Sequence, residues 1–498
     1  MIRLVTWRRL HGPKADSLIA LSIPNIALLR KGDSVEMAEF RNQTLHDAFL
    51  RYAKLALELI SKSLEGGQVV TVIPETMWVD KGNALIRQER ERPLWIIVIH
   101  RLETELKSSP EYQECTRLLS EDVIIARQLN NMVGSSYMRM TLTAEDILNR
   151  FISEILEDKN GPTFDDTAAN ERYSEIESAL YSDEIINETL APLLGLDVRP
   201  DKIQLADEFA IERLTMEEIA SCVRFGLIRS GPSENFILNA PRYAVKVLLR
   251  EPKVIGEMDS TDEAQKSARR FGEAAARITE VVHALRLFKS GQCFLSGVVR
   301  RSKNWLMSGS MSGSGGPLFQ PPWFTEYKLD DSQVSGFKQF WDRLQSQGVK
   351  RRGFLEVAIK RFSYAAERQL PEDQLIDLMI SSEALFLCDV LEEQYRGELR
   401  YRLGLRAGFF IGPTASERRD IFRLMRSAYD ARSAIVHGGK PDLPARFGNL
   451  TDFVRKIEEY VREALHKAVV LASVPTTPKY LVDWDELVFS QESNENLR

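Results

Sequence analysis

Cysteine is scarce in this chain, with four residues in 498. They are Cys115, Cys222, Cys293 and Cys388. They lie far apart and form no C-x-x-C pair, a spacing that favours neither a disulfide framework nor a zinc cluster. The sequence also lacks a cluster of His, Asp and Glu with metal-ligand spacing. We therefore expect no metal, no cofactor and a reducing, cytoplasmic environment.

Long apolar runs are missing as well. The longest, such as residues 94–99, are much shorter than the roughly 20 residues that span a membrane. Residues 1–14 are basic but contain no apolar core or small-residue cleavage site, so we expect no signal peptide. A composition of 44% hydrophobic and 28% charged residues is typical of a soluble globular protein without a membrane partner.

Excess positive charge is the third absence, since the formal net charge is −6. This excludes a protein that holds long nucleic acid by bulk positive charge, although a small cationic cleft for RNA stays compatible with it. The phosphate-binding motif G-x-x-x-x-G-K-[ST], the dinucleotide motif G-x-G-x-x-G and the hydrolase motif G-x-S-x-G do not occur. Any catalysis must therefore depend on a smaller constellation of side chains.

The first part of the chain, residues 1–130, has the pattern of a small mixed α/β unit. Apolar runs predict strands near residues 17–29, 68–73 and 94–100, and helical spacing predicts a helix over 45–64. At 498 residues the chain is too long for one ordinary core, so this unit is expected to be one of several domains.

The middle part, residues 131–325, is expected to be mixed and largely helical. Its expected elements are a helix opened by the capping pattern at Thr143, a loop at 159–166, strand-like alternation at 203–214, and helices over 215–225 and 259–287. Residues 308–322 are rich in Gly and Ser, have almost no side chain able to build a core, and predict a flexible linker.

The third part, residues 326–475, is cleanly helical in its pattern and is followed by a tail, 476–498. Amphipathic stripes predict helices over 354–366, 375–386, 399–411, 416–437 and 450–471. Five helices with short connections indicate an antiparallel bundle. The expected fold is thus multidomain and mainly α, with a mixed α/β N-terminal region and a C-terminal helical bundle.

The strongest acid/base candidate lies near the end of the fourth of these helices. Arg432 and His437 are followed at once by Gly438-Gly439, a permissive turn that leaves the imidazole near an open helix end. Histidine can take and give a proton near neutrality, and arginine presents a planar fork that suits phosphate. The structural alternative is a histidine that stabilises the helix C-terminus beside an ordinary surface arginine.

Five residues separate Arg432 from His437, so they lie roughly 140° apart around a helix, whereas Ser433 lies one turn below the imidazole. An angle of this size between two functional side chains suits a helix that faces a cleft. A second identical helix across a two-fold axis would supply a second Arg and His, giving one base for a ribose 2′-hydroxyl and one acid for the 5′ leaving oxygen. The arginines would stabilise the phosphorane-like transition state.

Two further groups accompany the motif. Arginines crowd the same helix, at positions 418, 419, 423, 426 and 432, and form either a solvated face or a cationic cleft in which Arg426 supports the site. Glu383 lies in an apolar stripe of another helix, so it is expected to find a cation. That contact is either a structural salt bridge to Arg406 or Arg432, or orienting support for Arg432.

Three segments of the bundle resemble the signature of the Apea-like branch of the HEPN family, the higher eukaryotes and prokaryotes nucleotide-binding domain. They are residues 375–386 (LIDLMISSEALF), 398–407 (ELRYRLGLRA) and 429–439 (YDARSAIVHGG), in the order and with the spacing of that family. The resemblance covers residues 350–472 well and continues more weakly from residue 203. Residues 1–200 carry no such resemblance.

The resemblance implies a HEPN-type bundle and, since Arg432, Ser433 and His437 are all present, a metal-independent endoribonuclease acting as a homodimer or higher homo-oligomer. It would cut RNA, such as tRNA, and leave a 2′,3′-cyclic phosphate and a 5′-hydroxyl. The family also suggests antiphage defence by abortive infection. The N-terminal region would then sense a phage-derived trigger and restrain the nuclease.

Two other functions stay open. In the first, the bundle is a non-catalytic nucleotide-binding or dimerisation module of a regulatory protein, in which Arg432 holds a phosphate. In the second, the N-terminal region is the effector and the bundle only its oligomerisation handle. The lack of a recognisable catalytic motif before residue 300 argues against the second.

Overall fold

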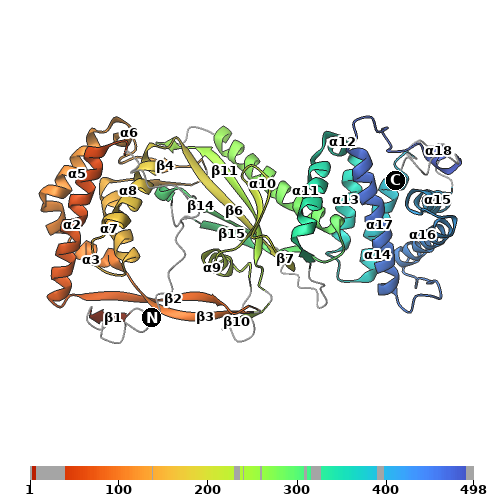
Figure 1. The fold of residues 1–498 in the computed structure, drawn as a ribbon, viewed down its shortest axis with the longest axis horizontal. Coiled ribbons are helices and arrows are strands. Elements are labelled where there is room, and N and C mark those ends of the chain that lie inside the picture. Colours follow the sequence, from red (N-terminus) through yellow and green to blue (C-terminus); the bar gives the residue numbers. More distant parts are fainter. Residues whose placement is uncertain are drawn as a thin grey trace.

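The computed structural model describes most of the chain, including all of the expected bundle except residues 326 and 390–397. The described residues are 3–6, 40–82, 84–136, 138–228, 236–238, 240–257, 261–307, 311–315, 327–389 and 398–489. The molecule is elongated, with a helical cluster at its N-terminal end, a sheet in its middle and a helical region at its other end (Figure 1). None of the described helices is long and apolar enough to cross a membrane.

The longest helices of the N-terminal cluster are four. They are α2 (Gln43–Glu65), α5 (Pro110–Glu121), α7 (Ala144–Asp158) and α8 (Asp166–Tyr181). The helices expected over 45–64 and after Thr143 are therefore present, the second with its capping box. The ring of Phe49 lies 5.2 Å from those of Phe151 and Tyr173, so the core that starts in α2 continues through α8 and does not end near residue 130.

One expected strand of this region is wrong. Residues 95–100 lie in helix α3 (Trp95–Arg101), which follows its N-cap residue Leu94 and in which Trp95, Val98 and Ile99 are buried. These positions follow the i, i+3, i+4 spacing of one helical face, and a short apolar run does not distinguish such a face from a buried strand. The strand expected over 17–29 lies outside the described residues.

A long hairpin connects the N-terminal cluster to the central sheet. Its strands are β2 (Val69–Asp80), which contains the strand expected over 68–73, and β3 (Ala84–Pro93). Figure 1 shows it running along the lower edge of the molecule. At its far end, Trp78 and Leu85 join a small core with the central region, and Arg242 bonds Asp80 at 2.8 Å.

The central region is organised around an antiparallel sheet. Its main strand order is β15 (Met311–Gly315), β14 (Gly297–Ser302), β6 (Glu184–Leu194), β11 (Tyr243–Pro252), β9 (Phe209–Arg213) and β8 (Lys202–Ala206). The alternation at 203–214 is the β8–β9 hairpin. Part of the expected Gly/Ser linker forms edge strand β15; residues 308–310 and 316–322 lie outside the described residues. The region thus has more strand than the sequence pattern indicates.

Helix α10 (Thr261–Phe288), expected over 259–287, joins the sheet to the C-terminal helices. Its buried Ile278 and Val282 belong to the same core as Val245 and Val247 of β11 and as the bundle. The buried guanidinium of Arg286, near the end of α10, donates to the carbonyl oxygen of Ser363 in the bundle at 2.9 Å. The central sheet and the C-terminal helices therefore share one continuous hydrophobic core.

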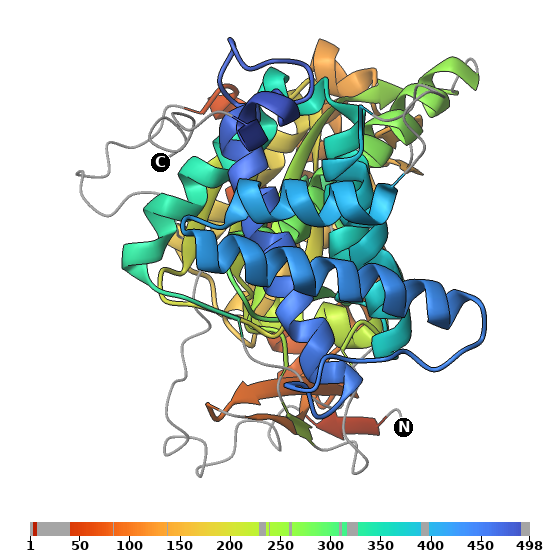
Figure 2. The ribbon, with the colours of Figure 1, turned by 90° about the vertical axis from the view of Figure 1, so that its right-hand side faces the viewer.

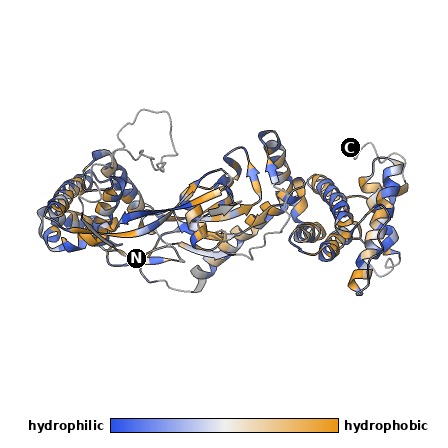
Figure 3. Cartoon of the chain, turned by 90° about the horizontal axis from the view of Figure 1, so that it is seen from below, coloured by the Kyte–Doolittle hydropathy of each residue, from blue (hydrophilic) through white to orange (hydrophobic). Residues whose placement is uncertain are grey.

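The C-terminal region contains the five helices that the sequence predicts. They are α13 (Gly353–Ala365), α14 (Pro371–Phe386), α15 (Leu399–Ile411), α16 (Ala415–Val436) and α17 (Leu450–Ala472). Hydrophobic and hydrophilic residues alternate around these helices, as expected for amphipathic helices that cover a shared core (Figure 3). Helices α15 and α16 lie side by side as the outer layer at the end of the molecule (Figure 2).

Shorter elements complete the fold. They are β1 (Arg3–Thr6), α4 (Glu103–Ser108), α6 (Val123–Ala126), β4 (Met132–Gly134), β5 (Arg139–Thr141), β7 (Leu196–Val198), α9 (Met216–Arg224), β10 (Phe236–Leu238), β12 (Val254–Ile255), β13 (Phe294–Leu295), the 3-10 turn Trp305–Met307, β16 (Tyr327–Leu329), α11 (Asp331–Gln345), α12 (Gln347–Lys350) and α18 (Trp484–Phe489). Helix α18 lies in the expected tail, and its Trp484 is buried against Phe386 and Phe410.

Candidate functional site

Helix α16 carries the Arg432/His437 motif. Thr414 and Glu417 form a capping box at its start, in which each residue bonds the backbone N–H of the other. Its buried face consists of Ile421, Leu424, Met425, Ala428 and Ala431. These apolar contacts fix the rotation of α16, so the residues between them are directed away from the core.

The end of α16 is a Schellman motif. The Gly438 N–H donates to the Ile435 carbonyl at 3.0 Å, and the Gly439 N–H donates to the Ala434 carbonyl at 2.8 Å. Gly438 has a φ of +77°, which glycine adopts without strain. His437 is the C-cap residue and its side chain is exposed. The expected Gly-Gly helix end is therefore present, and it leaves the imidazole open to solvent.

Arg432 lies on the other side of α16 and faces α14. It is half-buried, and its Nε is buried without a hydrogen-bond partner in the described part of the chain. Glu383 of α14 is the acid near it. Burial raises the pKa of Glu383, and the positive charge of Arg432 opposes that rise. The two charges thus act on each other, although no ion pair within 4.0 Å joins them among the described residues.

The expected alternative partner of Glu383 is occupied elsewhere. Arg406 of α15 binds both carboxylate oxygens of Asp389, at 2.6 and 2.9 Å, and donates to the Phe386 carbonyl at 2.7 Å. A structural salt bridge from Glu383 to Arg406 is therefore wrong. The expected salt bridge from Glu383 to Arg432 is also absent among the described residues, so Arg432 acts on Glu383 only through its charge, and orienting support for Arg432 stays a prediction.

The remaining predicted site residues, Ser433 and Arg426, both lie on α16. Ser433 is half-buried one turn before His437, and the His437 N–H donates to its carbonyl at 3.2 Å. Arg426 lies further up the helix, with its guanidinium 5.2 Å from the centre of the Phe422 ring. Its Nε, like that of Arg432, is buried without a partner among the described residues. A single chain thus provides the arginines of α16 and the exposed imidazole of His437 at one end of the molecule.

Other nucleophile and base candidates are poorly placed. All four cysteines are buried, and burial raises the pKa of each thiol to about 12, so they stay protonated at neutral pH. Burial lowers the pKa of His283 to about 4. His466 has a lowered pKa for the same reason and stacks on Phe340 at 4.7 Å. His437 is therefore the bundle histidine that a substrate can reach.

One group of potential metal ligands lies outside the bundle. Ligand atoms of His100, Glu103 and Glu145 lie within 4.8 Å of one another. Sequence reasoning missed this group because its three residues belong to three helices, α3, α4 and α7. The Lys107 ammonium lies 2.5 Å from Glu103 and 2.8 Å from Glu145, so it forms an ion pair with both carboxylates. Ion pairing with Lys107 accounts for the cluster of His100, Glu103 and Glu145, so we do not assign a metal to the cluster.

Glycines of α15 set the position of α16, and sequence reasoning missed them. A Cβ on Gly408 would lie 2.7 Å from the Arg418 carbonyl oxygen, and one on Gly412 would lie 2.8 Å from the Arg418 nitrogen. A Cβ on Gly404 would lie 3.0 Å from the Phe422 carbonyl oxygen. The spacing of these glycines, one every four residues, is the sequence signal that predicts such a close helix contact.

We expect Gly408→Ala to destabilise the bundle, because its methyl group forces α15 away from the backbone of α16. Overpacking of this kind costs about 1–3 kcal/mol in the free energy of unfolding, measured by urea denaturation. Gly272→Ala in α10 is the matched control, since nothing lies within 4 Å of its Cβ position. That helix substitution should stabilise slightly. Equal stability of the two variants would contradict the assigned α15–α16 contact.

Comparison with known proteins leaves the chain unassigned: no family model, curated protein or solved structure matches it.

Proposed function

We propose that this chain is a metal-independent endoribonuclease whose active site forms when two copies meet through the α15–α16 end. The proposal rests on the surroundings of Arg432 and His437 in one chain. His437 is exposed at a helix end, and Arg432 has a buried Nε with no partner among the described residues. A second copy and an anionic substrate would supply the binding partners that both side chains lack in one chain.

In the proposed reaction, His437 of one copy accepts the proton of a ribose 2′-hydroxyl. The 2′-oxygen attacks the adjacent phosphorus, and the bond from phosphorus to the 5′-oxygen breaks. The partner copy's equivalent of the same histidine donates a proton to the leaving 5′-oxygen. Arg432 stabilises the charge on the phosphorane-like transition state. The products are a 2′,3′-cyclic phosphate and a 5′-hydroxyl, and water, metal and redox chemistry are not required.

The preceding 330 or so residues are proposed to regulate this site, because a permanently open ribonuclease would harm its own cell. The core shared by α10, the central sheet and the bundle supports such coupling. Antiphage defence, with a phage-derived trigger sensed by the N-terminal region, is the biological role suggested by the HEPN resemblance.

The test is cleavage of total RNA or purified tRNA in EDTA, with the termini of the fragments analysed chemically. Cleavage that survives chelation and leaves cyclic phosphates supports the proposal. If RNA binds but stays intact under activating conditions, the bundle is instead a nucleotide-binding or dimerisation module. The N-terminal restraint is addressed by repeating the assay with infected-cell extract as the source of the trigger.

Glu383→Gln tests the role of the acid behind Arg432. Glutamine keeps the shape but removes the charge that orients the guanidinium, so kcat should fall about tenfold, or about 1.4 kcal/mol in activation free energy. The KM should change little, because Glu383 does not touch the substrate. Steady-state kinetics and thermal unfolding are measured together. A fall in unfolding temperature with unchanged kcat would assign Glu383 a purely structural role.

A further inference from the structure

The exposed side of α16 carries one continuous polar stripe that ends at His437. Its members follow one another at steps of four, three, four, three and four residues: Arg419, Arg423, Arg426, Asp430, Ser433 and His437. At 100° per residue, all of them lie within about 40° of a common line along the helix. The stripe therefore leads from the start of α16 directly to the proposed base.

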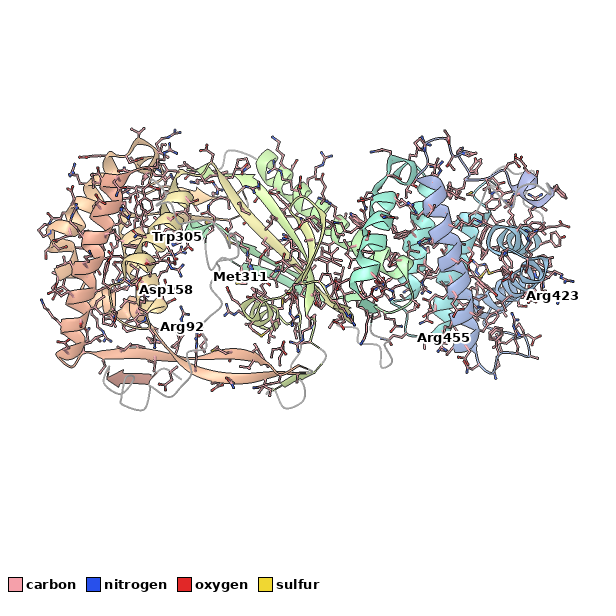
Figure 4. All side chains as sticks on the ribbon, in the orientation of Figure 1. Arg92, Asp158, Trp305, Met311, Arg423 and Arg455 are labelled. Carbon is pink, nitrogen blue, oxygen red and sulfur yellow. The ribbon has the colours of Figure 1, made fainter. Side chains whose placement is uncertain are left out.

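Positive charge dominates the part of this stripe that is farthest from His437. Arg419 and Arg423 are exposed, and no carboxylate lies within ion-pair distance of Arg419, Arg423 or Arg426 among the described residues. The one acid of the stripe, Asp430, is neutralised by an ion pair with Arg400 of α15. Figure 4 shows Arg423 at the outer end of the molecule. Three arginine side chains thus remain available to an anion.

The protein itself uses little of the hydrogen-bonding capacity of these arginines. Arg419 donates from Nε to the Ala415 carbonyl at 3.3 Å, which leaves both terminal nitrogens free of described partners. Arg426 has a buried Nε without a partner in the described chain. A solvated surface arginine has no reason to bury an unbonded donor, whereas an arginine that meets a phosphate gains from a partly desolvated site.

We propose that Arg419, Arg423 and Arg426 form a backbone track that holds one flank of an RNA strand whose scissile phosphate lies at His437. This inference rests on the proposed nuclease function. The arginines lie 11 to 18 residues before His437, which corresponds to about 16–27 Å along the helix. Apart from His437, the stripe has no aromatic side chain for base stacking, so the track reads phosphates and not sequence.

The effect of substrate length distinguishes the role of this track from that of the catalytic groups. A dinucleotide reaches His437 without touching Arg419 or Arg423, so its kcat/KM should not depend on these two arginines. A twelve-residue RNA spans both His437 and the track, so loss of Arg419 and Arg423 should raise its KM and leave kcat unchanged. A merely structural role of the arginines would affect both substrates equally.

The decisive measurement is binding of a fluorescent twelve-residue 2′-O-methyl RNA, which cannot be cut because its 2′-oxygens are blocked. Anisotropy titrations over a range of salt compare the full chain with R419A/R423A. Each phosphate contact on a single strand contributes about −0.7 to the slope of log K against log salt. The double variant should therefore lose about 1.4 of slope and at least about tenfold in affinity.

Arg455→Ala is the matched control, because Arg455 is an exposed arginine of α17 away from the stripe (Figure 4). It should retain the wild-type affinity and salt slope. An unchanged slope in R419A/R423A, or an equal loss in both variants, would overturn the track. If the stripe-dependent binding is found but cuttable RNA stays intact, the track stands and the nuclease function fails. If RNA is cut with no dependence on the stripe, the nuclease function stands and the track fails.

Discussion

His437→Ala is expected to lower the rate of RNA cleavage about 10²–10⁴-fold, the usual contribution of a general acid or base. The substitution removes both proton transfers at once, because each copy in the proposed dimer contributes the same histidine. Arg432→Ala should cost about 10²–10³-fold, since it removes a donor aimed at the developing phosphorane charge. The measurement is single-turnover cleavage of end-labelled RNA in EDTA.

The fold of these variants should be intact. His437 is exposed and follows the last helical residue, so its removal leaves the Schellman motif of the two glycines in place. His100→Ala serves as the control, because His100 is a similarly exposed histidine at the opposite end of the chain. It should cleave at the wild-type rate. Cleavage that persists without His437 would exclude this mechanism.

The helices of the bundle could be predicted from the sequence because each carries its own periodic signal. The ends of α16 are defined by Thr414 with Glu417 and by Gly438, and both capping patterns depend on local backbone chemistry alone. The buried residues Leu424, Met425 and Ala428 repeat at helical spacing between these ends. Local patterns of this kind need no knowledge of the rest of the fold.

The central sheet could not be predicted in the same way. Strand β6 is buried along most of its length, but its sequence EIINETLAPLL places Asn187, Glu188 and Thr189 in its middle, so it shows neither the alternation of a half-exposed strand nor a continuous apolar run. Its neighbours β11 and β14 are about 50 or more residues away in sequence. The short apolar run at Trp95 was ambiguous for a related reason, since a few buried residues fit both a helix and a strand.

The candidate site was partly readable from the sequence. The position of His437 at an open helix end followed from the adjacent glycines. The surroundings of Glu383 could not be predicted, because only the tertiary structure places Asp389 against Arg406 and leaves Arg432 as the cation that acts on Glu383 without an ion pair.

Val436→Glu is expected to abolish both pairing and cleavage. Val436 is 54% exposed at the outer end of the molecule and directly precedes His437, and Tyr401 of α15 is 47% exposed on the same pair of helices. Large apolar side chains at this end suit burial against a second copy. Across a two-fold axis the same surfaces meet, so each introduced carboxylate approaches its twin. Like charges in an interface cost several kcal/mol, which corresponds to a loss of pairing of at least about 100-fold.

Sedimentation velocity at micromolar concentration measures the pairing, and the EDTA cleavage assay measures its consequence. Val357→Glu is the matched control, because Val357 is 46% exposed but belongs to α13, away from the α15–α16 layer. The wild-type protein and this control should both pair and cleave. Val436→Glu should sediment as a monomer, and its activity should fall to the level of His437→Ala, because a single copy holds only one imidazole. A monomeric variant that still cleaves would show that one chain contains the whole active site, and the shared arrangement of His437 would then have to be abandoned.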